Sequence, residues 1–187
     1  KRSLLSATIS KFHDPDLKHE LHTKIQYKDQ VKTNLDLLET KNVEKRTIET
    51  IIDLIKGEDD KKILVAYNYL MGLSNIIKEL ESVSKDDIAI LHSSSKKKPI
   101  DGYEKSEIID NSLPNKINFI TAAYFNGFDL EDDAHVIIAV DVKVRSLAIS
   151  AKTVYQICGR LRKGAASIKV IGKFQNIPYR QYNYDEL

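Results

Sequence analysis

HVIIAVD, residues 135 to 141, sets five apolar residues in a row between a histidine and an aspartate. An apolar run of this length, without the alternation of a half-exposed strand, is typical of a strand buried on both faces of a parallel sheet. Similar runs recur along the chain in SLLSAT (3 to 8), KILVAY (62 to 67), IAILH (88 to 92), INFIT (117 to 121) and SIKVIG (167 to 172). Together they predict the strands of one sheet.

Helical patterns lie between these predicted strands. Their apolar residues recur at three- and four-residue spacing, in the sets Ile48, Ile51, Ile52, Ile55; Leu73, Ile76, Ile77, Leu80; and Val154, Ile157, Cys158, Leu161. Gly57 is expected to end the first helix, Ser150 to cap the third and Gly164 to end it. Strands that alternate with helices predict a doubly wound α/β fold, with a mainly parallel sheet and helices on both faces.

Composition favours one domain of intracellular type. A chain of 187 residues with 42% hydrophobic residues is long enough for one sizeable core. The single cysteine, Cys158, excludes an internal disulfide framework and favours a reducing compartment. Apolar runs are all shorter than a membrane span requires, so we expect a soluble, cytoplasmic protein with no membrane partner.

Charge is distributed unevenly. From Val142 to Tyr184 there are nine Lys or Arg residues and no Asp or Glu, although the average acid content of the chain predicts about six acids there. This excess of cations predicts an anionic partner for the last quarter of the chain. The alternative is a chance fluctuation on a solvated face.

Two irregular stretches follow predicted strands: SSSKKKPIDG, residues 93 to 102, and TAAYFNGFDLEDDA, residues 121 to 134. The second is a long link with little room for a full helix. Because ligands of open α/β sheets bind beyond the carboxyl ends of the strands, both loops begin where a ligand is expected. Residues 13 to 45 are predicted to form a connector and a helix.

Four short sequences carry a family resemblance when they are taken in order. They are SAT (6 to 8), KILVAYNYL (62 to 70), TAAYFNGFD (121 to 129) and QICGR (156 to 160). In this order and spacing they resemble motifs III, IV, V and VI of superfamily 2 helicases, the class that includes the DEAD-box and DEAH-box proteins. The resemblance spans residues 3 to 164. It implies a RecA-like fold, with residues 1 to 12 ending a first RecA-like domain, 13 to 45 forming a connector and 46 to 187 forming the C-terminal RecA-like domain.

The resemblance assigns nucleotide chemistry to the cations around motif VI. It implies that Arg160 and a following cation reach the γ-phosphate of ATP, while Gln156 positions the nucleotide and the nucleophilic water. The commonest family pattern places the second arginine three residues after the first, where this chain has Lys163. Arg162 follows Arg160 by two residues, a spacing that some family members show. Arg162 is therefore the preferred second arginine finger, meaning an arginine that contacts the transferring phosphate. The alternative is that these cations only complement the dipole of a helix end.

Motif V implies two kinds of contact. Asp129 is the residue expected on the nucleotide side, with Gly127 and Lys163 as further cofactor-binding candidates. Thr121 is expected to touch nucleic-acid phosphates, which position a strand without reading its bases. For Gly127, the alternative is a turn with no further role.

The loop after the predicted strand IAILH supplies the other candidate contacts with nucleic acid. They are His92, Ser93, Ser94, Lys96, Lys97 and Lys98. Hydroxyl and ammonium groups favour phosphate binding that does not depend on sequence. A solvated lysine run is the alternative. Near the end of the sequence Tyr179, Tyr182 and Tyr184 flank Arg180, and they either stack on bases or pack on a neighbouring domain.

Three further patterns are rejected as sites. DDAH, residues 132 to 135, is close to the family's Walker B sequence, but its acids precede an apolar strand instead of ending one. GRLRKGAAS, residues 159 to 167, has glycines at P-loop spacing but lacks the required Lys and Ser or Thr. His19 and His22 have no third ligand nearby, and no metal site is predicted in this chain.

No Walker A motif and no correctly placed Walker B motif occur in these residues. The resemblance therefore implies that ATP and Mg²⁺ are held mainly by the first RecA-like domain, which this chain lacks, and that the chain alone is inactive. We expect the C-terminal motor domain of an ATP-dependent nucleic-acid helicase or translocase, working with DNA or RNA and with that first domain, either free or as part of a restriction or repair complex. The alternative is a non-catalytic nucleic-acid or protein binding module that has a helicase-like fold.

Overall fold

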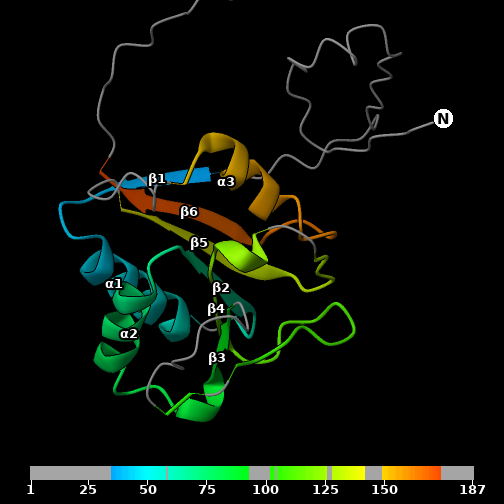
Figure 1. The fold of residues 1–187 in the computed structure, drawn as a ribbon, viewed down its shortest axis with the longest axis horizontal. Coiled ribbons are helices and arrows are strands. Elements are labelled where there is room, and N and C mark those ends of the chain that lie inside the picture. The colour runs from blue at the N-terminus through cyan, green and yellow to red at the C-terminus, as the bar shows by residue number, and fades with distance from the viewer. Residues whose placement is uncertain are drawn as a thin grey trace, which may run out of the picture.

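One six-stranded, all-parallel sheet organises the chain in this computed structural model (Figure 1). The structure describes residues 35–57, 59–92, 102–103, 105–125, 128–141 and 149–173. The strands are β1 (Leu35–Glu39), β2 (Lys62–Tyr67), β3 (Ile88–Leu91), β4 (Ile117–Ile120), β5 (Ala134–Val140) and β6 (Ser167–Gly172). Their order across the sheet is β1-β6-β5-β2-β4-β3. Five of the strands match predicted apolar runs, whereas SLLSAT and its motif III resemblance lie outside the described residues.

Helices cover both faces of the sheet, which confirms the predicted α/β fold class and is consistent with a RecA-like fold. The helical elements are α1 (Val43–Lys56), α2 (Leu70–Glu79), α3 (Ala151–Cys158) and the short 3₁₀ turns η2 (Lys85–Asp87) and η3 (Ala122–Tyr124). Helices α1 and α2 pack on one face, and α3 packs on the other (Figure 1). In the described part of the chain, every helix is too short or too polar to cross a membrane.

Two apolar layers fill the space between the sheet and its helices. Ile63 and Val65 of β2 point into the layer shared with α1 and α2, while Leu64 and Ala66 point into the layer shared with α3. This division follows from the strand geometry, because successive side chains lie on opposite faces. Burying a large aliphatic side chain stabilises the fold by about 1.5–3 kcal/mol. The near-continuous apolar runs of the sequence are therefore the source of both layers.

Helix ends follow the predicted capping residues in part. The Ser150 side chain accepts a hydrogen bond from the Thr153 N–H at 3.1 Å, as expected for an N-cap. Helix α3 ends at Cys158 and not near Leu161, so the prediction that Gly164 ends the helix was wrong. Gly164 instead has φ +88°, a left-handed conformation that suits glycine, and makes the turn before β6.

Strand β1 was not predicted. It lies inside residues 13 to 45, for which the sequence predicted a connector and a helix, and pairs in parallel with β6 from Leu35↔Ile168 to Glu39↔Gly172. As the edge strand, β1 has only one neighbour, and only Leu38 packs against a core layer. Leu37 remains 62% exposed on the other face. A strand covered on one side lacks the apolar run that marked its neighbours.

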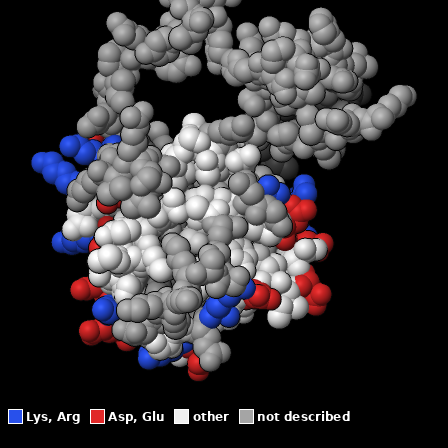
Figure 2. Space-filling model, viewed as in Figure 1, with Lys and Arg blue, Asp and Glu red and all other residues white. Residues whose placement is uncertain are grey.

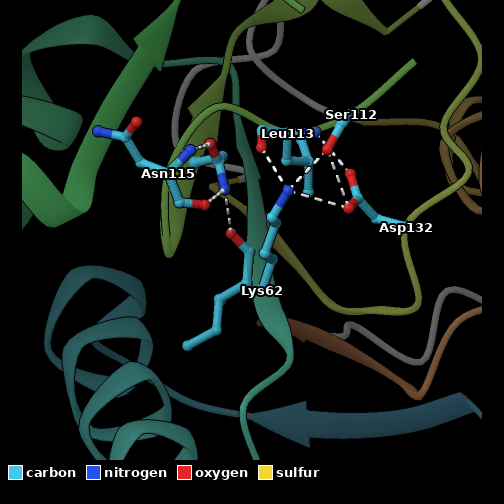
Figure 3. A network of polar contacts seen from close by, with 7 residues as sticks. Lys62, Ser112, Leu113, Asn115 and Asp132 are labelled. Atoms are coloured by element: carbon cyan, nitrogen blue, oxygen red, sulfur yellow. Dashed lines mark hydrogen bonds and ion pairs between the residues drawn. The ribbon is translucent and has the colours of Figure 1, made fainter. Parts of the chain in front are cut away.

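A polar network fastens the amino end of β2 to two loops (Figure 3). The Lys62 Nζ donates hydrogen bonds to the Ser112 Oγ at 2.7 Å, to the Leu113 carbonyl at 2.6 Å and to the Asp132 Oδ1 at 3.0 Å. The other Asp132 oxygen accepts the Leu113 N–H. The first acid of the DDAH sequence therefore has a structural partner.

The other two polar residues of DDAH, Asp133 and His135, also have partners. Asp133 pairs with Lys61 at 3.0 Å on the surface. The His135 ring bonds Asp59 through Nε2 at 2.8 Å and Ser167 through Nδ1 at 2.7 Å. These contacts hold the amino ends of β2, β5 and β6 together.

We predict that Asp132→Ala lowers the free energy of unfolding by about 2–3 kcal/mol, because it removes the carboxylate that pairs with Lys62 and leaves the Leu113 N–H without its acceptor. The matched control is Asp133→Ala, which removes the adjacent surface carboxylate and should cost at most about 1 kcal/mol. The Asp132 side chain is 16% exposed and that of Asp133 is 52% exposed. Urea denaturation of the two variants checks the difference, and equal losses would contradict the structural role of the network.

Candidate functional site

Two predicted nucleic-acid contacts meet at the carboxyl ends of adjacent strands. His92 follows β3 and Thr121 follows β4, and the last paired residues of these strands are Leu91 and Ile120. The Thr121 N–H donates to the Leu91 carbonyl at 3.3 Å. Both His92 and Thr121 are buried, so a ligand backbone must approach this edge closely to touch them.

Asn68 joins this edge of the sheet and was missed by sequence reasoning. It follows β2, and its Oδ1 accepts a hydrogen bond from the Ala122 N–H at 3.3 Å. The contact joins residues 54 positions apart and fixes the start of η3. A polar residue directly after the KILVAY run was the signal available in the sequence.

The topology favours the same edge as a ligand site. From β2 the chain leaves through α2 on one face of the sheet, whereas from the adjacent β5 it leaves through α3 on the other face. Adjacent strands with connections on opposite faces form a topological switch point, where ligands of open α/β sheets bind. Asn68 lies directly at this point.

A second group of predicted residues comes together on the loops that precede β5 and β6. The Leu130 N–H donates to the Arg160 carbonyl at 2.8 Å, and the Arg162 N–H donates to the Leu130 carbonyl at 2.8 Å. These two bonds clip the motif V segment to the motif VI segment. As a result the side chains of Asp129, Arg160 and Arg162 form one cluster.

Within the cluster Asp129 holds the two arginines unequally. The Arg162 Nη2 donates to the Asp129 Oδ2 at 2.6 Å, whereas the Arg160 Nη1 lies 3.7 Å from the Asp129 Oδ1, too far for a hydrogen bond. The hydrogen bond from Arg162 is the main cause that lowers the pKa of Asp129, and burial opposes it. Among the described residues, the buried Arg160 Nε has no hydrogen-bond partner. Arg160 is therefore the arginine of the cluster whose Nε–H has no acceptor among the described residues.

A hollow of about 580 Å³ opens beside this cluster. Arg160 and Asp129 form one side of it, and the aromatic rings of Tyr124 and Phe128, with centroids 6.5 Å apart, lie along the wall. Glu107 also lines it and pairs with Lys105 at 2.7 Å. The hollow thus offers guanidinium donors, carboxylate acceptors and apolar ring faces to a small polar ligand. The aromatic residues were not predicted to line a site.

Of the other predicted site residues, Gln156 and Lys163 are described by the structure and six are not. Gln156 is half-buried on α3, four residues before Arg160, and Lys163 is exposed on the loop that follows. The remaining candidates lie outside the described residues: Gly127, Ser93, Ser94, Lys96, Lys97 and Lys98. In the part of the chain that the structure describes, no three His, Cys, Asp or Glu residues are grouped as a metal site.

The nucleic-acid candidates and the Asp129 cluster lie at opposite ends of the sheet's strands. His92 and Thr121 lie beyond the carboxyl ends of β3 and β4, whereas the Asp129 cluster lies near the amino ends of β5 and β6. Figure 2 shows one face of the molecule, where described basic and acidic side chains both lie around the rim and uncharged residues lie between them. The described charges in this view therefore do not form a patch of one sign.

The comparisons with known proteins add no relative: no family model matches the chain, and no curated protein matches it with significant similarity.

We predict that Arg162→Ala raises the pKa of Asp129 toward its ordinary value, because the main hydrogen bond to the carboxylate is lost. Lys163→Ala removes the neighbouring exposed cation and should leave this pKa unchanged. Carbon NMR of the aspartate carboxyl groups across an acid titration measures both variants. An Asp129 pKa that is the same in wild type and Arg162→Ala would contradict the geometry of the cluster.

The same contact predicts an acid dependence of stability. The folded-state pKa of Asp129 lies below its unfolded value of 3.8, so the contact stabilises the fold above that value. The contribution is lost as the pH falls through the lowered pKa. Arg162→Ala should remove this part of the acid destabilisation.

Proposed function

We propose that this chain is the C-terminal motor domain of an ATP-dependent nucleic-acid helicase or translocase, supplying an arginine finger and contacts to the nucleic-acid backbone. The observation that carries the proposal is the cluster of Asp129, Arg160 and Arg162. Asp129 and Arg162 are 33 residues apart in sequence, yet they share a hydrogen bond on two clipped loops. The helicase resemblance assigned these residues to one nucleotide-dependent task, and their proximity supports it.

Arg160 is the arginine best suited to act on a phosphate. Phosphoryl transfer is catalysed mainly by positioning and by cations that stabilise the charge on the transferring group. Guanidinium stays charged and binds phosphate oxygens through two parallel donors. Arg160 has a buried Nε without an acceptor among the described residues and a long contact to Asp129, so its donors are free to turn to an anion. When bound, ATP supplies the phosphoryl group on which this arginine acts.

Arg162 and Asp129 have a supporting role in this account. The short bond between them fixes the loop that carries Arg160 and offsets one positive charge of the cluster. Gln156, on α3 four residues before Arg160, is assigned to positioning the nucleotide, and the exposed Lys163 to a further phosphate contact. Mg²⁺ is assigned to a separate ATP-binding domain, because no Walker A motif and no correctly placed Walker B motif occur in these residues.

Nucleic acid is assigned to the other edge of the sheet. Thr121 is assigned to a phosphate oxygen of the nucleic-acid backbone, and within the described residues its side chain does not cap η3. His92 lies beside it, and the loop with Lys96, Lys97 and Lys98 follows His92 directly. The domain would then bind the nucleic-acid backbone at one end of the sheet and a phosphate, through Arg160, at the other end. Closure of a two-domain motor can couple these two sites.

We predict that Arg160→Ala lowers nucleic-acid-stimulated ATP hydrolysis by about 10³-fold or more while ATP binding is retained, because a finger acts on the transition state. The assay uses the natural full-length protein that carries this chain. Arg160→Lys should not restore activity, since an ammonium lacks the planar pair of donors. Arg162→Ala should cost less, because Arg162 acts through Asp129.

Two results would contradict this proposal. An active wild type that Arg160→Ala matches would remove the finger assignment. A full-length protein that binds nucleic acid but hydrolyses no ATP would favour the non-catalytic binding module.

For the nucleic-acid contacts, we predict that Lys96, Lys97 and Lys98 changed together to Ala weaken binding of single-stranded oligonucleotides equally across sequences. The slope of log K against log salt should fall by about 2, because three phosphate contacts are lost. The control variant changes Lys45, Lys56 and Lys78, which are exposed on α1 and α2, to Ala and removes the same charge. Fluorescence anisotropy at several salt concentrations measures both variants, and equal slopes would return the lysine run to an ordinary solvated surface.

A further inference from the structure

A second hollow lies between α3 and the β1 edge of the sheet, and it meets the proposed nucleotide site only at Arg162. We name it the α3–β1 groove; its volume is about 870 Å³. Its floor is Leu35, Leu37, Ile168 and Val170, and its α3 wall includes Val154, Tyr155 and Cys158. Figure 1 shows α3 beside β6 and β1 on this face of the sheet.

The groove exposes apolar surface that a doubly wound sheet normally covers. Leu37 is 62% exposed and Tyr155 is 66% exposed, and with Leu35 they make three of the six exposed large apolar residues in the described part of the chain. Parallel sheets are covered on both faces. On the opposite face of the same strand, Leu38 does pack against the core under α1 and α2. Within the described residues, the β1 end of the α3 face therefore lacks one covering element.

Cations mark both ends of the groove. Arg162 lines it near the amino end of β6, and Lys173 lines it directly after the carboxyl end of that strand. An occupant that suits this groove is apolar or aromatic along its length and acidic at one end.

Residues 174 to 187 have this composition and begin at the groove. They follow Lys173 directly and contain Phe174, Ile177, Tyr179, Tyr182 and Tyr184, then Asp185 and Glu186. Fourteen residues reach about 45 Å when extended. Strand β6 has six residues and is about 20 Å long, so the segment can return along the groove to Arg162.

The segment that precedes β1 fits less well. It also joins the groove, at Leu35, but its last seven residues, KDQVKTN, contain one aliphatic side chain, two lysines and one aspartate, and so carry a net positive charge. Lysines would lie close to Arg162 and oppose docking there. We propose that residues 174 to 187 dock in the α3–β1 groove, with their tyrosines over Leu37 and β6 and with Asp185 and Glu186 near Arg162.

Cys158 provides the readout, because it is the only cysteine of the chain and lines the groove. Burial raises the pKa of its thiol to about 11, so alkylation is slow and sensitive to further cover. The rate of reaction with N-ethylmaleimide, followed by mass spectrometry on the full chain, reports whether the groove is occupied. Thermal unfolding of each variant confirms that it is folded.

We predict that Tyr179→Ser with Tyr182→Ser speeds alkylation of Cys158 by about tenfold or more, because the cover opens more often. The matched control, Gln181→Ser with Asn183→Ser, changes polar neighbours and should leave the rate unchanged. A second variant, Asp185→Lys with Glu186→Lys, keeps every apolar residue and should speed alkylation at low salt only.

Other occupants give other results, and each would overturn the proposal. A rate that rises on dilution of the wild type indicates a second copy of the chain in the groove. A rate that responds only to Leu21→Ser with Ile25→Ser indicates the segment before β1. Equal rates in all folded variants indicate that residues 174 to 187 do not cover Cys158.

Discussion

The burial of one parallel sheet on both faces is the constraint on which the rest of this structure depends. Each central strand sends alternate side chains into opposite apolar layers, as Ile63 and Leu64 of β2 do. Because both layers must be filled, the connections cross the sheet on opposite faces and the loops are left at the ends of the strands. Both candidate sites lie on such loops. Their positions are therefore consequences of how the core is made.

The loops are fastened to the sheet by polar contacts close to the proposed arginine finger. Asp132 joins Lys62 of β2 to Leu113, and the Glu131 N–H donates to the Asn111 carbonyl at 2.9 Å. Leu130, one residue earlier, makes the clip to the arginine segment. Asp129 is thus attached to a stretch of chain whose position is fixed by these bonds. A finger needs this kind of support, because stabilisation of a transition state depends on donors that are already in position.

The sequence predicted those features of the fold that depend on neighbouring residues, and it missed those that depend on contacts between distant segments. Buried strands such as β5 were predicted because their apolar runs record burial on two faces. Strand β1 was missed because an edge strand buries one side only, and the end of α3 was misplaced because Leu161 continues the apolar spacing after the helix has stopped. Asn68 and the aromatic wall of Tyr124 and Phe128 were missed because their positions arise from contacts between distant segments. The pairing of Arg162 with Asp129 likewise became visible only in the fold.

We propose above all that Arg160 stabilises charge on a phosphate during transfer, with Asp129 and Arg162 holding it in position. The most direct measurement is the affinity of the full-length protein for ADP with aluminium fluoride, a mimic of the transition state, compared with its affinity for ADP. We expect that Arg160→Ala weakens binding of the mimic by about 10³-fold and leaves ADP affinity unchanged. Equal affinities of wild type and Arg160→Ala for the mimic would contradict it.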